Sequence, residues 1–343
     1  MERNLIIGPD FCAITEDGVL TEYLTRDPKE QYGDIVGGTV ERMMPGNGCA
    51  FVNIGRKTSG FLPLQENSQS FEGDMLKSGM KIVVQIRKEE TGRKGAFLTR
   101  DITIAGKSSL LMPMNRYVGI SSRITEEEDR ERLRAIGKKV TAGKTGIVLR
   151  TAALHMNEEE IAEEFLQLTE KWKQVCEQVQ NGFSDGTVLF HQDPLMQMVH
   201  DYETLGIDRR IECDSLPADL QRQLRDAEAR TVRLRNGGNI VIDRCEAMTV
   251  IDVNSGSSKM EDGQEQGFLE TNLAACETAA AQIRLRNLSG IIMIDFIDMK
   301  QEADQDRVFS RLDEMLRRDR RKTVLHGWTR LGIMEMTRKR TGK

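Results

Sequence analysis

Residues 239–254 read Asn-Ile-Val-Ile-Asp-Arg-Cys-Glu-Ala-Met-Thr-Val-Ile-Asp-Val-Asn, and a second apolar run, Ile-Ile-Met-Ile-Asp-Phe-Ile, occupies 291–297. Runs rich in β-branched residues predict strands, and the more polar segments around them show helical patterns. The expected strands are 239–243, 248–253 and 291–297, and the expected helices are about 268–286 and 305–318. Strand, helix and strand in this order predict a parallel pair buried under helices. Residues 239–343 are therefore expected to form an α/β domain.

Asp252 and Asp295 occupy equivalent places, each after a run of apolar residues. Parallel strands would set both side chains at the same end of the sheet, which is where open α/β sheets bind ligands. Two adjacent carboxylates repel unless a proton or cation lies between them, and magnesium prefers hard oxygen ligands. Asn254 points to the same side of the strand as Asp252 and is placed to orient its carboxylate. The pattern predicts a magnesium site.

Other residues leave alternatives open. An aspartate at the end of a buried strand often only caps the following turn, and this is the expected role of Asp243. Asp298, three residues after Asp295, is a further candidate metal ligand. The four histidines are scattered and indicate no histidine-based nuclease. The six cysteines lack the paired spacing of a zinc site or a redox motif, so reduced thiols are expected.

Length and composition set the broad class. A chain of 343 residues predicts several domains, and 38% hydrophobic with 30% charged residues is typical of a soluble globular protein. No long apolar window or secretory signal is found, so a cytoplasmic location is expected. The net charge of −5 argues against indiscriminate nucleic-acid binding. The stretch 316–343, with ten Lys or Arg against two acids, predicts a basic surface that contains Trp328.

Residues 34–103 carry short β-rich runs with Gly-rich turns, which predict a small closed barrel. The phrases GGTVERMMPGNGCAFVNIGRKTSGFLPLQE and GDMLKSGMKIVVQIRKEETGRKGAFLTRDI resemble the OB-fold RNA-binding barrel first described in a ribosomal protein. The resemblance implies that Phe51 and Phe61 stack on nucleobases, at about 1–3 kcal/mol per base. It also implies that Lys88 and Lys94 meet phosphates. The alternative is that both phenylalanines belong to the barrel core.

Three further phrases resemble the signature of the bacterial ribonuclease E and G family: VIDRCEAMTVIDVNSGS, TNLAACETAAAQIRLRNLSGIIMIDFIDM and RLGIMEMTRKR. The resemblance extends along the whole chain. It implies that Asp252, Asn254 and Asp295 form the catalytic magnesium site. It also implies a domain order: 1–33, the first part of an RNase-H-like subdomain; 34–103, the OB-fold barrel; 104–190, a 5′-sensor region; 191–238, the shortened remainder of the RNase-H-like subdomain; and 239–343, a DNase-I-like catalytic domain.

The same resemblance assigns a phosphate site. A helix is expected to start at Asn157, and the strand before it ends in Arg150 and Thr151. In the family such an Arg-Thr pair binds the 5′-monophosphate of RNA, and a glycine matching Gly106 gives a backbone contact. A guanidinium group binds phosphate bidentately and a hydroxyl adds a donor. Taken alone, Arg150 would be an ordinary surface charge, and residues 152–155 lack a glycine of the family pattern.

Together these features predict a magnesium-dependent endoribonuclease that cuts single-stranded RNA, in processing or decay of rRNA precursors and mRNA. Products with a 5′-phosphate and a 3′-hydroxyl are implied, with a preference for 5′-monophosphorylated substrates. The alternative is a non-catalytic RNA-binding protein with a decayed nuclease core; the short segment 201–234 favours it and the intact carboxylates oppose it. The family's zinc-binding cysteine phrase is missing before Lys343, so no zinc link is expected, and a homodimer or higher oligomer is left open.

Overall fold

The computed structural model describes residues 2–27, 31–64, 76–90, 94–256 and 264–339. The chain divides into two compact units. The terminal unit contains residues 1–26 and 201–341, and the central unit contains residues 27–200. The RNase-H-like, 5′-sensor and DNase-I-like labels for parts of these units stay predictions.

The smaller sheet of the terminal unit has the strand order β14-β1-β2-β3. Its strands are β1 (Arg3–Ile7), β2 (Phe11–Glu16), β3 (Val19–Thr25) and β14 (Arg209–Glu212). β1 and β14 are parallel, with Ile6 beside Ile211, so the N-terminal strands complete a sheet with a much later strand. Helix α4 (Ala218–Asp226) contributes Leu220 to the core beneath this sheet, together with Leu20 and Leu285.

The larger sheet of the terminal unit has the order β15-β16-β17-β18-β20-β19. Its strands are β15 (Thr231–Arg233), β16 (Asn239–Arg244), β17 (Met248–Asn254), β18 (Gly290–Asp295), β19 (Thr323–Trp328) and β20 (Met334–Arg338). The predicted parallel pair is confirmed, since β17 and β18 run parallel while the other pairs are antiparallel. Helices α5 (Gln264–Leu285) and α6 (Glu302–Leu316) pack on this sheet, as expected.

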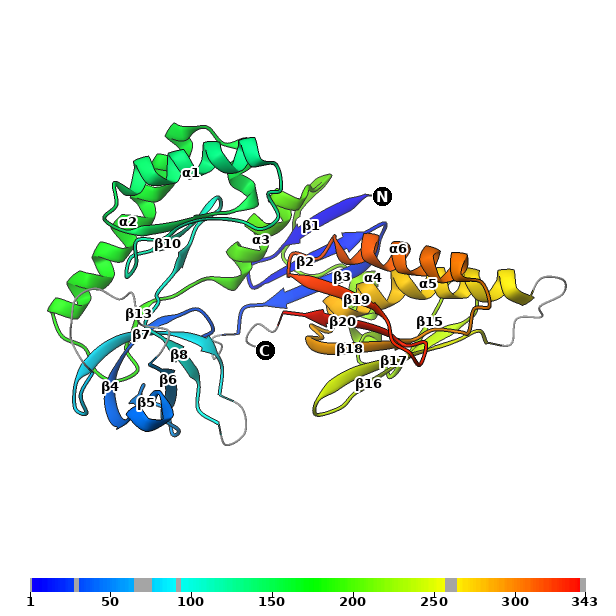
Figure 1. Cartoon of the computed structure of the whole chain (residues 1–343), viewed down its shortest axis with the longest axis horizontal. Coiled ribbons are helices and arrows are strands. Elements are labelled where there is room, and N and C mark those ends of the chain that lie inside the picture. The colour runs from blue at the N-terminus through cyan, green and yellow to red at the C-terminus, as the bar shows by residue number, and fades with distance from the viewer. Residues whose placement is uncertain (1, 28–30, 65–75, 91–93, 257–263, 340–343) are drawn as a thin grey trace. The chain divides into compact units, whose positions relative to one another are not determined.

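The helices cover only one face of the larger sheet (Figure 1). Ile251 and Ile294 point into the core with the helices, whereas their neighbours alternate outward. Met248 and Ile291 are exposed on the other face. The expectation of strands buried under helices was therefore wrong for that face. Apolar runs cannot by themselves distinguish a sheet covered on both faces from one covered on a single face.

The prediction of a basic surface over 316–343 is wrong for Arg338 and Arg320. Arg338 is buried, and its Nε donates to Asp319 at 2.6 Å. Arg320 pairs with Glu22 at 2.7 Å and with Asp201 at 3.2 Å. These cations lie inside the unit because carboxylates distant in sequence neutralise them there. Trp328 is half-buried, 5.8 Å from the ring of Phe296, and residues 340–343 lie outside the described part of the chain.

The predicted closed barrel is confirmed in the central unit. Its strands are β4 (Ile35–Met44), β5 (Cys49–Asn53), β6 (Gly60–Pro63), β7 (Lys81–Lys88) and β8 (Phe97–Thr99), with the short helix η1 (Pro45–Asn47) between β4 and β5. Pairing of β4 with β7 closes the barrel, and β13 (Val188–Phe190) adds to β4. Its interior is filled by small and branched side chains such as Val52, Leu62 and Ile86.

A second sheet of the central unit has the order β11-β12-β10-β9. Its strands are β9 (Ile104–Ala105), β10 (Ser109–Met112), β11 (Val118–Ile120) and β12 (Gly146–Leu149). Helices α1 (Glu127–Thr141) and α2 (Glu158–Gln180) pack beside it (Figure 1). The predicted start of α2 is confirmed: Asn157 and Glu160 form a reciprocal capping box. Helix α3 (Pro194–Leu205) leads the chain onward to the terminal unit.

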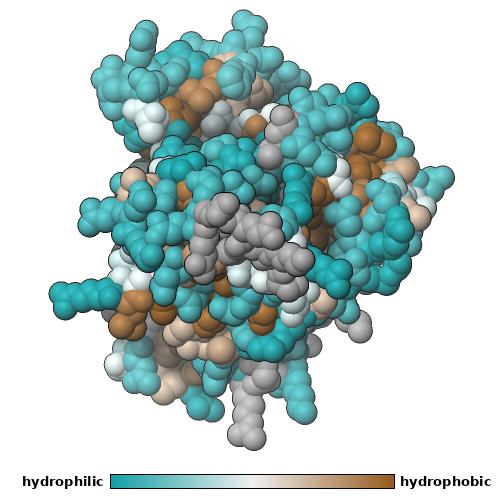
Figure 2. All heavy atoms as spheres, turned by 90° about the vertical axis from the view of Figure 1, so that its right-hand side faces the viewer, coloured by the Kyte–Doolittle hydropathy of each residue, from teal (hydrophilic) through white to brown (hydrophobic). Residues whose placement is uncertain are grey.

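Figure 2 shows a face on which hydrophilic side chains predominate and apolar ones gather in small groups. None of the helices in the described part of the chain combines the length and apolar character that crossing a bilayer requires.

Candidate metal centre and nucleic-acid interface

Asp252 and Asp295 lie side by side in the larger sheet. They are register partners in the parallel pairing of β17 with β18, and both side chains are exposed on the face without helices. The residues before and after Asp252, Ile251 and Val253, are buried on the opposite face. Because successive side chains along a strand point to opposite faces of the sheet, both carboxylates point to the exposed face. Asn254 has the same orientation, and its Nδ2 donates to Oδ2 of Asp252 at 2.8 Å.

The electrostatics of this pair favour a cation. Desolvation, followed by repulsion from the carboxylates of Asp252 and Asp298, raises the pKa of Asp295 above its ordinary value. Ionisation of Asp295 is thus opposed by the negative charge of its two neighbours. A bound cation would relieve that repulsion without protonation.

The donor set fits magnesium. It consists of hard oxygen ligands, and Asn254 fixes the orientation of one carboxylate. Among the described residues, no group of three or more His, Cys, Asp or Glu side chains is placed to hold a metal ion. Two carboxylates are nevertheless sufficient for magnesium, which commonly keeps several waters and takes further oxygens from substrate phosphates. The pair Asp252 and Asp295 would hold the ion.

Asp243 has a different role from this pair. Both of its carboxylate oxygens accept hydrogen bonds from Arg230, at 2.6 and 2.7 Å. The bond to Arg230 lowers the pKa of Asp243, so the group is ionised and satisfied without a metal. Its role is an ion pair between β16 and the segment before β15, rather than the turn cap that its position suggested. Asp298 lies beyond β18 and acts on Asp295 through charge.

The barrel carries Phe51 and Phe61 on its outer surface. They are register partners on β5 and β6, with ring centroids 6.1 Å apart. Both rings are half-buried, and neither belongs to the barrel's buried cluster, which is built from the alternate residues such as Ala50 and Val52. The alternative that they form the core is therefore wrong. Their exposed ring area is of the kind on which bases stack.

Lys88 is exposed at the end of β7, with its Nζ 5.3 Å from the ring centroid of Phe97. Phe97 in turn lies beside Phe61, with centroids 5.7 Å apart. Lys94 is exposed three residues before Phe97. The sequence analysis missed Phe97, although its alternation with the buried Ala96 and Leu98 was a usable signal.

The structure also brings together Arg150, Thr151 and Gly106. Arg150 follows β12 and donates from Nη1 to the carbonyl oxygen of Gly106 at 2.8 Å. Thr151 begins the short helix η3 (Thr151–His155), and its hydroxyl lies 3.4 Å from that of Ser121. The backbone N–H of Gly106 donates to Ser109 at 2.8 Å, closing the turn between β9 and β10. Gly106 is thus joined to Arg150 through its carbonyl rather than presenting its amide.

Glu164 of α2 is a second residue that the sequence analysis missed. Its carboxylate accepts hydrogen bonds from the backbone N–H groups of Lys107 and Ser108 and from the hydroxyls of Ser108 and Ser109. A Cβ added to Gly106 would lie 2.1 Å from this carboxylate, so any larger residue would require the Glu164 side chain to shift. The turn 106–109 is therefore an anion-binding turn whose anion comes from the protein itself. Glu164 lies between Ile161 and Leu168 on the inward side of α2, and this position was the available signal.

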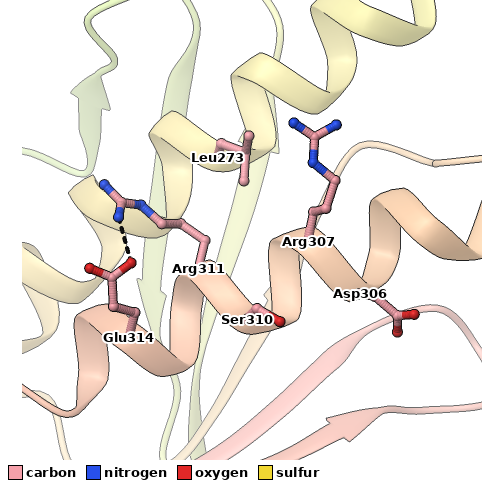
Figure 3. Close-up of a pocket in the computed structure, with 6 residues that line it drawn as sticks. All are labelled: Leu273, Asp306, Arg307, Ser310, Arg311 and Glu314. Atoms are coloured by element: carbon pink, nitrogen blue, oxygen red, sulfur yellow. Dashed lines mark hydrogen bonds and ion pairs between the residues drawn. The ribbon is translucent and has the colours of Figure 1, made fainter.

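A hollow of about 420 Å³ lies along α5 and α6, lined by Leu273, Asp306, Arg307, Ser310, Arg311 and Glu314 (Figure 3). Arg311 is held by Glu314 at 2.6 Å and by Glu277 at 2.5 Å, so its charge is already satisfied. These helices cover the face of the sheet opposite to Asp252 and Asp295. The hollow is therefore separate from the candidate metal centre.

Comparison with known proteins shows that this chain is similar to ribonucleases of one family. The sequence model described as "Ribonuclease E/G family" matches residues 103–216 and 217–341. Ribonuclease G of Haemophilus influenzae is 33% identical over 98% of this chain and 79% of its own length. Ribonuclease G of Escherichia coli K12 is 32% identical with the same coverage. Ribonuclease E of the cyanobacterium Nostoc is 31% identical over all of this chain and 56% of its own.

A barrel with an aromatic outer surface and a sheet with paired carboxylates on one exposed face are features expected of an enzyme that acts on nucleic acid. The chain belongs to the ribonuclease E/G family. The aligned region spans 387 positions against 343 residues in this chain, so the ribonuclease G of Haemophilus carries additional residues within it. The two parts of the family match meet at 216 and 217, inside the segment that the sequence analysis expected to be shortened.

Proposed function

We propose that this protein is a magnesium-dependent endoribonuclease that cuts single-stranded RNA internally and leaves a 5′-phosphate and a 3′-hydroxyl. The observation that carries the proposal is the register pairing of Asp252 with Asp295 on an exposed sheet face, with Asn254 bonded to the first of them. The names of its relatives, ribonuclease G and ribonuclease E, support the same reaction class. A cytoplasmic location and a role with rRNA precursors or mRNA stay predictions.

The chain's own residues would act as follows. Asp252 and Asp295 supply negative charge and oxygen ligands at one point of the exposed sheet face, and Asn254 restrains the first carboxylate. Phe51 and Phe61 hold unpaired bases by stacking, which accepts any sequence because every base has a π face. A magnesium ion, when bound, supplies a water of lowered pKa and offsets charge that builds on the phosphodiester.

An internally labelled RNA incubated with the protein tests this function. We expect fragments in the presence of magnesium, none after chelation with EDTA, and recovery when magnesium is added in excess. The fragments should accept ligation at their 5′ ends without prior phosphorylation. Cleavage that persists in EDTA would refute the metal dependence. Binding without cleavage under any condition would instead support the alternative of an RNA-binding protein with a decayed core.

We further propose that Arg150 and Thr151 recognise a 5′-monophosphate. A guanidinium beside a hydroxyl supplies charge-assisted donors for phosphate oxygens. The bond from Arg150 to the carbonyl of Gly106 positions that guanidinium next to the turn 106–109. Binding of the terminal phosphate here would raise the local concentration of the RNA at the enzyme, so substrates with a 5′-monophosphate would be cut faster than those with a 5′-hydroxyl.

Arg150→Gln tests the 5′-phosphate site. We expect the ratio of kcat/KM between 5′-monophosphorylated and 5′-hydroxyl oligoribonucleotides to fall by about 10- to 100-fold, the equivalent of one charge-assisted hydrogen-bonding group. The 5′-hydroxyl substrate should be cut at the wild-type rate. Arg134→Gln, which removes a partly exposed arginine on α1, is the matched control and should leave the ratio unchanged. A preserved ratio in Arg150→Gln would contradict the assignment.

A further inference from the structure

Three phenylalanines form a continuous row across the outer surface of the barrel. Phe51 pairs in register with Phe61 across β5 and β6, and Phe61 pairs in register with Phe97 across β6 and β8. The centroid distances along the row are 6.1 and 5.7 Å. All three rings are half-buried, whereas the residues that alternate with them fill the barrel interior. The row therefore presents three adjacent aromatic rings at the surface.

The packing of the barrel does not explain Phe97. Its ring belongs neither to the buried hydrophobic cluster of the barrel nor to the partly buried residues packed against that cluster, which are Met43, Leu64, Leu76 and Met80. Its register partner on β7 is Lys88, whose ammonium lies over the ring at 5.3 Å from the centroid. A half-buried ring at the surface with a cation over it combines a stacking surface with a charge that attracts phosphate.

We propose that Phe97 is a third nucleobase platform of the barrel, next in line after Phe51 and Phe61, and that Lys88 contacts the phosphate of the nucleotide stacked there. This inference rests on the proposed RNA-binding function of the barrel. Three stacked bases lie within the range of about 4–16 nucleotides that a single OB fold holds. The ammonium of Lys88 lies over the ring at 5.3 Å from its centroid, and from there it would move to the phosphate of the nucleotide that stacks on Phe97.

The chain offers a matched control. Lys81 lies over the ring of Phe183 at 5.4 Å, which is nearly the same geometry as Lys88 over Phe97. The ring of Phe183, however, packs inward against Gly37 and joins the core beneath α2. Leucine at either position keeps much of the apolar volume and removes the π face. A comparison of the two leucine variants thus separates base stacking from loss of an aromatic residue in general.

The test measures binding of a fluorescent ten-nucleotide oligouridylate to the full chain in EDTA. We expect Phe97→Leu to weaken binding by about 5- to 100-fold, with Phe97→Trp restoring it and Phe183→Leu leaving it unchanged. A series of oligonucleotides with one abasic position gives the sharper readout. Wild-type protein should lose affinity at three positions, and Phe97→Leu should become insensitive at one of them. Lys88→Gln should reduce the slope of log affinity against log salt by about one.

The outcomes separate this inference from the proposed function. If Phe51→Leu and Phe61→Leu weaken binding while Phe97→Leu does not, the third platform is refuted and the RNA-binding barrel stands. If Phe97→Leu weakens binding equally for every abasic position, its role is structural and the inference fails as well. If none of the three variants changes affinity, the proposed RNA-binding surface itself is wrong.

Discussion

Asp252→Asn and Asp295→Asn should each reduce RNA cleavage by about a thousandfold or more while RNA binding is retained. Asparagine has the size of aspartate and still accepts hydrogen bonds, but it removes the negative charge that a divalent cation requires. Both side chains are exposed, so neither substitution disturbs the core under the helices. The loss should therefore appear in kcat rather than in stability. Cleavage of a fluorescent oligoribonucleotide at saturating magnesium gives the rate, and its anisotropy in EDTA gives the affinity.

Asp243→Asn is the matched control for these variants. Asp243 lies on the neighbouring strand, but its carboxylate is already paired with Arg230. We expect this variant to cut RNA at nearly the wild-type rate. Asn254→Ala should show an intermediate loss, of about 10- to 100-fold, because it removes the group that orients Asp252. Wild-type rates in either Asp252→Asn or Asp295→Asn would overturn the metal assignment. A loss in Asp298→Asn as large as in Asp295→Asn would add a third ligand to it.

Removing the buried carboxylate of Asp319 should destabilise the terminal unit by about 3–5 kcal/mol. Asp319 and Arg338 are 1% and 0% exposed, and they are joined by two hydrogen bonds of 2.6 and 3.2 Å. In Asp319→Ala the guanidinium of Arg338 stays charged inside the protein without its counter-ion. Urea unfolding followed by the fluorescence of Trp328, in a Trp172→Phe background, reports on this unit because Trp172 belongs to the central unit.

Asp313→Asn is the control for this loss. It removes an ion pair with Arg317 on the surface of α6, where the arginine is 78% exposed, and should cost about 0.5 kcal/mol or less. The double variant Asp319→Leu with Arg338→Met should recover much of the lost stability, since replacing a buried pair by apolar groups is often neutral. Equal effects of Asp319→Ala and Asp313→Asn would contradict the importance of burial.

The stability supplied by Asp319 should depend on pH. Burial opposes its ionisation, but the hydrogen bonds and charge of Arg338 outweigh that effect and lower the pKa of Asp319 below its ordinary value. An aspartate whose pKa is lower in the folded state contributes stability that is fully present above its pKa in the unfolded state, which is about 4. That contribution is lost as the pH falls through the folded value. The difference between wild type and Asp319→Ala should therefore shrink on acidification below pH 4, measured by urea titrations at a series of pH values.

Local patterns predicted much of the fold and the candidate metal centre. Alternating or continuous apolar runs predict β16, β17 and β18, and a helix between parallel strands predicts that Asp252 and Asp295 are neighbours, as the structure shows. The capping box at Asn157 was also predicted from residues close in sequence. These features depend on residues close in sequence, whose spacing fixes which side of a strand or helix they occupy.

Contacts between distant residues could not be predicted in this way. Glu22 and Arg320 are 298 positions apart, and nothing in either neighbourhood indicates the other. Arginines near the end of the chain were interpreted as surface charges because charged residues seldom lie in the interior. The alternation of Phe97 with its buried neighbours is a local signal that its ring points outward, but only the pairing of β6 with β8 places it beside Phe61. Such contacts depend on which distant strands and side chains pair in the folded protein. The residues around each partner do not indicate that pairing.

The terminal unit is built from two segments separated by the whole central unit. Residues 1–26 leave the ribosome well before residues 201–341, and at about 5–20 residues per second the delay is roughly ten to forty seconds. Throughout that time β1 cannot pair with β14, and Glu16 cannot form its ion pair with Arg284. The central unit has all of its strands and can fold first. Synthesis thus imposes an order of assembly in which the barrel can form before Asp252 and Asp295, the proposed metal ligands, are brought together.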